Sequence, residues 1–302
     1  MLRAPHLKLT AVHFAKHSLR GGAGLIAIFL TLIIGLVCAA AVIAPLETAD
    51  RVASQMHARG HDVSDAEVAE MSEQARAEML RVGTSVIQWA TDTSDAQVEY
   101  WLQEKPALVS AMLVLLMLFT PLFSCLAGFN QTSGDIGSKG LRYLLIRTER
   151  ENIFVGRLIG AIIFNAVVLA ILFLILALYV AVKIKMYPTG TSLAWLAGGY
   201  VRVLIFSLPY VAMCAWISGM IDSPFGSLTV AWLIAYIWPL LVRIGSMSTA
   251  QFKYANYLTP WGYKWWLFSE NPGMVAAGTA VMLAFAALFL WIGLRMFKKR
   301  DL

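Results

Sequence analysis

Residues 134–160 read GDIGSKGLRYLLIRTERENIFVGRLIG and run directly into the apolar stretch AIIFNAVVLAILFLILALYVAV of residues 161–182. Three glycines loosen the beginning of the basic segment: Gly134, Gly137 and Gly140. An apolar patch follows at 141–146, and the cations around it are Lys139, Arg142, Arg147 and Arg150. This pattern predicts a short interfacial helix with one face open to a soluble partner. The alternative is a solvated loop whose cations anchor it at anionic lipid headgroups.

The composition is typical of a membrane protein. Hydrophobic residues make up 59% of the chain and charged residues only 14%, whereas about a quarter of the residues in a soluble domain are charged. A helix needs about 20 apolar residues to cross the hydrocarbon core. Six stretches meet that requirement: 25–44, 107–129, 159–182, 193–220, 225–242 and 273–297. The sequence therefore predicts an all-α polytopic membrane protein with six transmembrane helices.

The distribution of Lys and Arg orients these spans. Of the 24 cations, 13 lie in residues 1–24, in residues 130–158 or around the end of the last span. By the positive-inside rule this side is expected to be the cytoplasm. The expected cytoplasmic parts are an N-terminal interfacial helix (1–24), a coupling segment (130–158) and a tail (298–302). The protein is expected to cross the plasma membrane several times, the cytoplasmic membrane in a bacterium. Both termini are expected in the cytoplasm.

Residues 45–106 are expected to form a helical extracytoplasmic insertion. From residue 46 onward this insertion carries twelve acids and five cations, a net charge of −7, while the rest of the chain carries +13. Ser64 and Glu67 are spaced as a capping box. A helix over 65–90 would then present one apolar stripe, and a contact with a twin subunit or an extracytoplasmic protein is predicted at Met71, Ala75, Met79 and Val82. The alternative cover is the chain's own 95–104 helix, whose Val98, Trp101 and Leu102 could also rest on the membrane interface.

Residues 243–272 are rich in aromatic side chains, including the stretch NYLTPWGYKWW. Tyr and Trp gather where the membrane meets water. The segment is therefore expected to lie along the outer interface or to re-enter it. An extracellular carbohydrate or peptide site would use the same residue types.

Motifs for enzymatic chemistry are absent from the sequence. There is no Walker A pattern, no G-x-G-x-x-G opening a helix after a strand, no H-E-x-x-H and no G-x-S-x-G. The chain is not expected to be an enzyme, to hydrolyse ATP itself or to hold a metal. Two polar residues at membrane depth, Arg202 and Asn165, are candidates for a substrate pathway. The alternatives are snorkelling or structural pairing for Arg202 and a helix–helix hydrogen bond for Asn165.

These parts, in this order, resemble the permease subunits of the type-2 ABC transporter family. The family pattern has an N-terminal interfacial helix, six spans and a cytoplasmic segment that begins with an acid and glycines. That segment passes through an L-L-L-like stretch into a G-K/R-L-x-G motif. The matching residues here are Asp135, Gly140, Leu141, Leu144, Leu145, Gly156, Arg157, Leu158 and Gly160, and the ending FKKRDL also matches. The chain departs from the pattern with Asp135 where Glu is frequent and with Arg147-Thr148 where Pro often follows.

The resemblance implies a half-transporter that pairs with a second permease copy or a paralogue. Each half would hold one subunit of a separate ABC ATPase dimer, which binds the ATP and Mg, so this chain would bind no cofactor. The residues that would couple to the ATPase are Asp135, Lys139, Leu141, Arg142, Leu144, Leu145 and Arg147. ATP hydrolysis would drive export of a substrate or motion of an extracytoplasmic partner protein, and no nucleic acid is expected as a partner. The alternative is a stand-alone membrane scaffold or channel without an ATPase.

Overall fold

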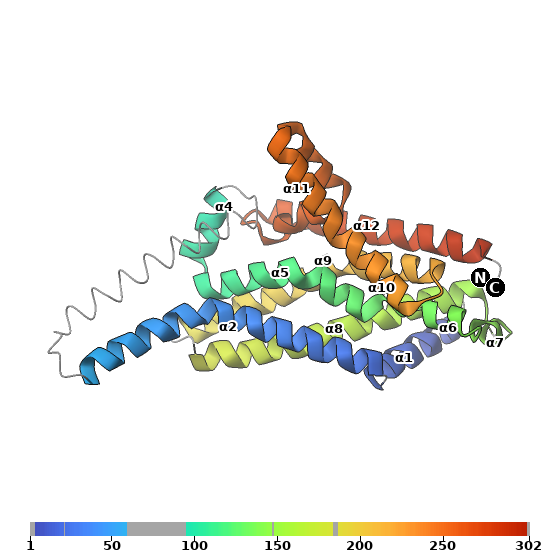
Figure 1. The fold of residues 1–302 in the computed structure, drawn as a ribbon, viewed down its shortest axis with the longest axis horizontal. Helices are drawn as coiled ribbons and strands as arrows, with labels where there is room; N and C mark the ends of the chain where they lie inside the picture. Colours follow the sequence, from blue (N-terminus) through green and yellow to red (C-terminus); the bar gives the residue numbers. More distant parts are fainter. Residues whose placement is uncertain (1–3, 21, 59–94, 147, 184–186, 301–302) are drawn as a thin grey trace. The chain divides into compact units, whose positions relative to one another are not determined.

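The computed structural model describes residues 4–20, 22–58, 95–146, 148–183 and 187–300, and within them all regular secondary structure is helical (Figure 1). Six stretches of the described chain are helical, long and apolar enough to cross a membrane. They are Gly24–Val42, Ala107–Gly137, Arg150–Lys183, Thr189–Met220, Pro224–Ser248 and Pro272–Lys299. The predicted fold class, an all-α polytopic membrane protein, is confirmed. A helix satisfies its backbone hydrogen bonds within one segment, which suits the hydrocarbon because lipid offers the backbone no hydrogen-bond partners.

The long helices are α2 (Gly22–Ala58), α5 (Ala107–Gly128), α8 (Arg150–Lys183), α9 (Thr189–Met220) and α12 (Pro272–Lys299). The shorter α-helices are α1 (Ala4–Arg20), α4 (Asp95–Glu99), α6 (Ser133–Gly137), α7 (Leu141–Leu145), α10 (Pro224–Trp232) and α11 (Trp238–Ser248). Two π-helical turns, η1 (Tyr100–Glu104) and η2 (Leu233–Ile237), and two 3₁₀ segments, η3 (Ala250–Leu258) and η4 (Pro260–Phe268), complete the described elements.

The chain divides into two compact units. Unit 1 comprises Met1–Leu32, Met117–Phe173 and Tyr200–Leu302, and unit 2 comprises Ile33–Leu116 and Leu174–Gly199. Unit 1 contains α1, α6, α7, the α10–α11 region and α12.

Two helices of unit 1 begin at signals that are visible in the sequence. At α10, the Ser223 hydroxyl accepts a hydrogen bond from the Gly226 N–H at 3.3 Å, and Pro224 follows it. At α12, the Asn271 side chain accepts from the Gly273 N–H at 2.8 Å, and Pro272 follows it. In both, the capping side chain satisfies a free N–H, and proline stands where no N–H is needed.

Helix α1 packs against α8 in unit 1. A Cβ added at Gly156 would lie 2.8 Å from the Thr10 Cβ, and one at Gly160 would lie 2.7 Å from the Ala11 carbonyl oxygen. Glycine is thus required at both positions for the backbones to approach this closely, as small residues allow between membrane helices. Helix α1, which the sequence predicts to lie at the membrane interface, is covered by α8 around Ala11.

Helices α2 and α8 extend furthest beyond the predicted spans. Helix α2 continues past residue 44 to Ala58, and α8 begins at Arg150 rather than near residue 159. The first turns of α8 are polar on one side but bury Asn152, Ile153 and Phe154 on the other. This packing explains why α8 starts ahead of its apolar run. The predicted segment 130–158 therefore contains α6, α7 and the beginning of α8.

In unit 2, the predicted 95–104 helix is divided into α4 and η1. The side chains of Val98 and Trp101 are buried, and Lys105 lies over the rings of Tyr100 and Trp195 at 5.0 and 5.6 Å from their centroids. Because they are buried, Val98 and Trp101 do not rest on the membrane interface, which was one use the sequence allowed them. The apolar stripe with Met71, Ala75, Met79 and Val82 lies outside the described residues.

Replacing Gly160 with alanine should destabilise the protein. The new methyl group would meet the Ala11 carbonyl, and overpacking of this kind costs about 1–3 kcal/mol, more than the ~0.5–1 kcal/mol that alanine contributes in a helix. Thermal unfolding of the purified chain should therefore show a lower midpoint for Gly160→Ala. The matched control is Gly198→Ala in α9, where a Cβ meets nothing within 4 Å. Equal midpoints for the two variants would contradict the close α1–α8 approach.

Candidate functional site

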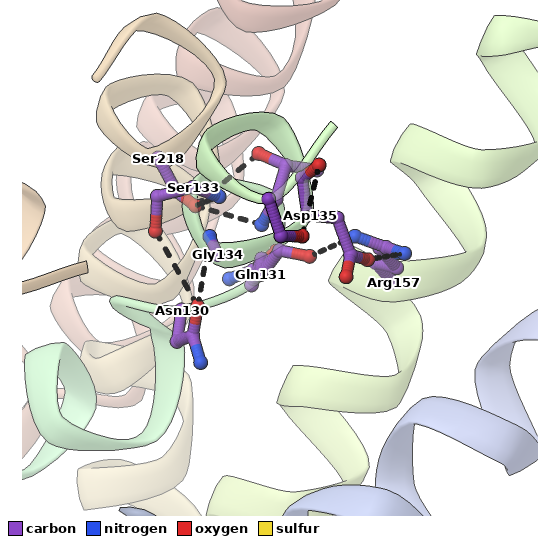
Figure 2. A network of polar contacts seen from close by, with 9 residues as sticks. Asn130, Gln131, Ser133, Gly134, Asp135, Arg157 and Ser218 are labelled. Carbon is purple, nitrogen blue, oxygen red and sulfur yellow. Dashed lines mark hydrogen bonds and ion pairs between the residues drawn. The ribbon is translucent and has the colours of Figure 1, made fainter. Parts of the chain in front are cut away.

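The candidate site is the end of unit 1 at which α5 passes into α6. Thr132 precedes α6 but makes no side-chain capping bond. Instead, the Ser218 hydroxyl of α9 accepts hydrogen bonds from the N–H groups of Thr132 and Ser133, at 2.8 and 3.0 Å. Figure 2 shows Ser218 reaching Ser133 in this way. A residue 85 positions away in the chain therefore caps the beginning of α6.

Arg157 fastens α6 to α8 (Figure 2). Its guanidinium donates to the Gln131 carbonyl oxygen at 2.6 Å and pairs with the Asp135 carboxylate. The Arg157 side chain is 9% exposed, so its charge is stable there only because both bonds are made. Asp135 was predicted to contact a partner subunit. In the structure its carboxylate is engaged by Arg157 of the same chain.

Helix α7 has one buried face and one exposed face. Leu141 is 1% exposed and belongs to a hydrophobic cluster with Phe154 of α8, Ala212 of α9 and Phe297 of α12. Leu145, one turn further, is half-buried against the same cluster. On the other side, Tyr143, Leu144 and Ile146 are exposed to 77%, 39% and 82%, and Arg142 is also exposed. We call the exposed side chains of Lys139, Arg142, Tyr143, Leu144 and Ile146 the α7 face.

Lys139 stands at the turn between α6 and α7. Its φ is +58°, in the left-handed region that side chains other than Gly, Asn and Asp seldom occupy. Its N–H donates to the Ile136 carbonyl at 3.0 Å, which closes α6, and its side chain is exposed. This conformation turns the chain between the two short helices.

The end of α12 is tied to the same region. Arg150 donates to the carbonyl oxygens of Lys298 and Arg300 at 2.9 and 2.6 Å. Arg300 in turn donates to the Gly219 carbonyl at 2.6 Å and pairs with Asp222. Side chains from α8 and from the end of α12 therefore satisfy the last carbonyl groups of α12 and α9, which have no partners within their own helices.

The loop after α9 also lies against α6. A Cβ added at Gly137 would lie 2.4 Å from the carbonyl oxygen of Asp222. The backbones of α6 and of the α9–α10 turn are thus in direct contact, and only glycine fits at position 137.

The predicted coupling residues separate into three groups. Lys139, Arg142 and Leu144 are exposed on the α7 face, whereas Leu141 and Leu145 point inward and hold the helix. Asp135 is engaged by Arg157, and Arg147 lies outside the described residues. Sequence reasoning missed the roles of Ser218 and of the Arg157–Asp135 pair. The available signal was that Asp135 is the one acid in the basic stretch 130–148.

The two candidate pathway residues lie in separate interactions. The Asn165 side-chain amide of α8 donates to the Ser207 hydroxyl of α9 at 2.8 Å, and Asn165 is 2% exposed. Arg202 is half-buried, and its guanidinium carbon lies 5.2 Å from the centroid of the Phe268 ring. Asn165 therefore makes a hydrogen bond between two helices, which was the alternative to a role in a substrate pathway. Arg202 has an aromatic neighbour.

The aromatic side chains of segment 243–272 contact one another and α12, where Phe285 lies with its ring centroid 6.2 Å from that of Tyr263. Tyr263 contacts Tyr257 and Trp266 edge-on, with centroids 5.2 and 5.0 Å apart. Lys264 is 5% exposed and lies over the rings of Trp261 and Trp265, at 4.5 and 5.0 Å. Tyr254 is exposed to 74% and suits an interface.

Comparison with known proteins leaves the site to be interpreted from its geometry. No protein-family model matches the chain, and no curated protein sequence is significantly similar to it. No group of three or more His, Cys, Asp or Glu residues suited to a metal occurs among the described residues.

Replacing Arg157 with alanine should loosen α6 and α7. The change removes the donor of the Gln131 carbonyl and the partner of Asp135, and hydrogen bonds to charged groups contribute about 1.5–3 kcal/mol. Trypsin should then cleave after Lys139 and Arg142 faster than in the unchanged protein. Arg295→Ala, which removes an exposed guanidinium stacked on Trp291, is the control. Cleavage at the same rate in all three proteins would show that Arg157 does not hold α6.

Proposed function

We propose that this chain is the transmembrane subunit of an ATP-driven transporter of the type-2 ABC class, and that a separate ATPase subunit binds the α7 face. The observation that carries the proposal is the two-sided packing of α7. Leu141 is buried among α8, α9 and α12, while Tyr143 and Ile146 on the opposite side remain exposed. A solvated loop has no need of so firm an anchor beneath an exposed apolar surface.

The charge around the α7 face supports a protein partner with an acidic rim. Lys139 and Arg142 are exposed beside the apolar side chains, and Arg150, Lys298 and Arg300 lie at the same end of unit 1. This concentration of cations favours the cytoplasm as the side that α7 faces. Apolar contacts at the centre and ion pairs at the edge are the usual arrangement of a protein interface.

The contacts beneath α7 would transmit force. A partner that displaced α7 would press Leu141 on the first turns of α8, and the same cluster contains side chains of α9 and α12. The Arg157–Asp135 and Ser218–Thr132 contacts prevent α6 from moving independently of α8 and α9. Binding energy at the α7 face can therefore change the arrangement of three spans.

In this proposal the working unit has two permease halves, identical or paralogous, and an ATPase dimer that holds ATP and Mg. The complex would reside in the plasma membrane with both permease termini cytoplasmic. It would export a substrate or move an extracytoplasmic protein. The energy source would be on another polypeptide, in keeping with the lack of a Walker A motif in this chain.

Leu144→Asp should abolish binding of the ATPase. The change places a charge among the apolar side chains of the α7 face, where burial without a partner opposes docking by several kcal/mol, about a thousandfold in affinity. The protein should be coexpressed with an ATPase encoded by a neighbouring reading frame with a Walker A motif, and copurification and ATPase stimulation measured.

The matched control is Met220→Asp, which exchanges an exposed apolar side chain for an acid at the end of α9, outside the α7 face. This variant should retain the ATPase. Loss of binding in both variants, or in neither, would exclude α7 as the contact. If the unchanged chain copurifies with no ATPase, the stand-alone scaffold or channel becomes the better assignment.

A further inference from the structure

The side chain of Tyr236 makes an unusual contact with the backbone of α5 in unit 1. Its hydroxyl donates to the Leu118 carbonyl oxygen at 3.2 Å and accepts from the Leu122 N–H at 3.1 Å. Residues 118 and 122 are four apart, so these groups are the acceptor and donor of one helical step. The tyrosine hydroxyl therefore bonds both the acceptor and the donor of one helical step.

The step lies beside a proline. Pro121 is inside α5 and has no N–H to donate to the Met117 carbonyl, and its ring crowds that carbonyl. The Leu118–Leu122 step is the next one along the helix. Prolines and inserted side chains are two established causes of bends in helices, and both occur here within one turn of α5.

The position of Tyr236 depends on a local irregularity of its own helix. It lies in the π-helical turn η2, between α10 and α11, and Pro239 follows shortly after. A π-turn has one extra residue, which rotates the side chains relative to a regular helix. The Tyr236 ring is supported from another side by Trp261, edge-on with centroids 6.0 Å apart.

We propose that Pro121 and Tyr236 form a hinge in the second span, in which the tyrosine hydroxyl serves as a second partner for both Leu118 and Leu122. When α5 bends and the step opens, the hydroxyl keeps the carbonyl and the N–H paired. When α5 straightens, the two groups bond directly. Tyr236 is thus a positioning residue that lets α5 change its bend without leaving a backbone group unpaired in the membrane.

The hinge joins two helices that also meet at the candidate site. Helix α5 continues through residues 129–132 into α6, and α10 begins just after Asp222, whose carbonyl lies against Gly137 of α6. A change of bend at Pro121 would displace α6 and, with it, the ends of α8 and α9 to which Arg157 and Ser218 bind it. The role of the hinge in transmitting motion rests on the function proposed above, but the existence of the hinge does not.

The test uses the full chain without an ATPase, in lipid nanodiscs. Amide hydrogen exchange at Leu122 is measured by mass spectrometry with residue-level fragmentation for the unchanged protein, Tyr236→Phe, Pro121→Ala and the double variant. The control is Tyr210→Phe. The Tyr210 side chain is also buried, and its hydroxyl makes no hydrogen bond within the described chain.

Tyr236→Phe should speed exchange at Leu122 by about threefold to tenfold, the range that corresponds to one net hydrogen bond, while Tyr210→Phe should leave it unchanged. In the Pro121→Ala background the effect of Tyr236→Phe should largely vanish, because a regular helix needs no second partner. A merely structural tyrosine would speed exchange at Leu122 equally in both backgrounds. Such an equal effect, or unchanged exchange at Leu122 in Tyr236→Phe, would overturn the hinge. Neither result depends on whether an ATPase binds.

Discussion

The buried guanidinium of Arg157 is the interaction on which the arrangement of the candidate site most depends. It bonds the Gln131 carbonyl where α5 ends and the Asp135 carboxylate where α6 begins, and it projects from the first turns of α8. A charge with so little exposure needs both partners, so the three elements are held in one geometry. The buried cluster around Leu141 and Phe154 then places α7 over α8, α9 and α12.

At several places in unit 1, a side chain from another part of the chain satisfies backbone groups that a helix leaves unpaired. Helix ends and breaks leave backbone groups without partners, and lipid cannot supply them. Side chains from elsewhere in the chain do so: Ser218 for the beginning of α6, and Arg150 and Arg300 for the last carbonyls of α12 and α9. Each such bond also links two helices, so satisfying the backbone and fixing the tertiary arrangement are one process.

The two faces of α7 explain how a short basic segment can be both firmly held and available. Leu141 and Leu145 are one helical turn apart and point inward, whereas Arg142, Tyr143 and Ile146 point outward. The exposed face is small and apolar with cations at its edge, which suits a protein surface better than water. Since its anchor lies among α8, α9 and α12, a partner bound there would act on the membrane-embedded part.

Hydropathy and the placement of Lys and Arg were sufficient to predict the six spans, the helical fold and the basic segment 130–158, because the length of an apolar run is set by the thickness of the membrane. The three exposed coupling residues, Lys139, Arg142 and Leu144, could also be predicted from the local pattern. The sequence could not show that Leu141 is an anchor, because all the leucines of 141–145 carry the same local signal. The Arg157–Asp135 pair, the cap from Ser218 and the contact of Tyr236 with α5 join residues 22, 85 and 114 positions apart. Such contacts depend on which helices lie together, and only the tertiary structure decides that.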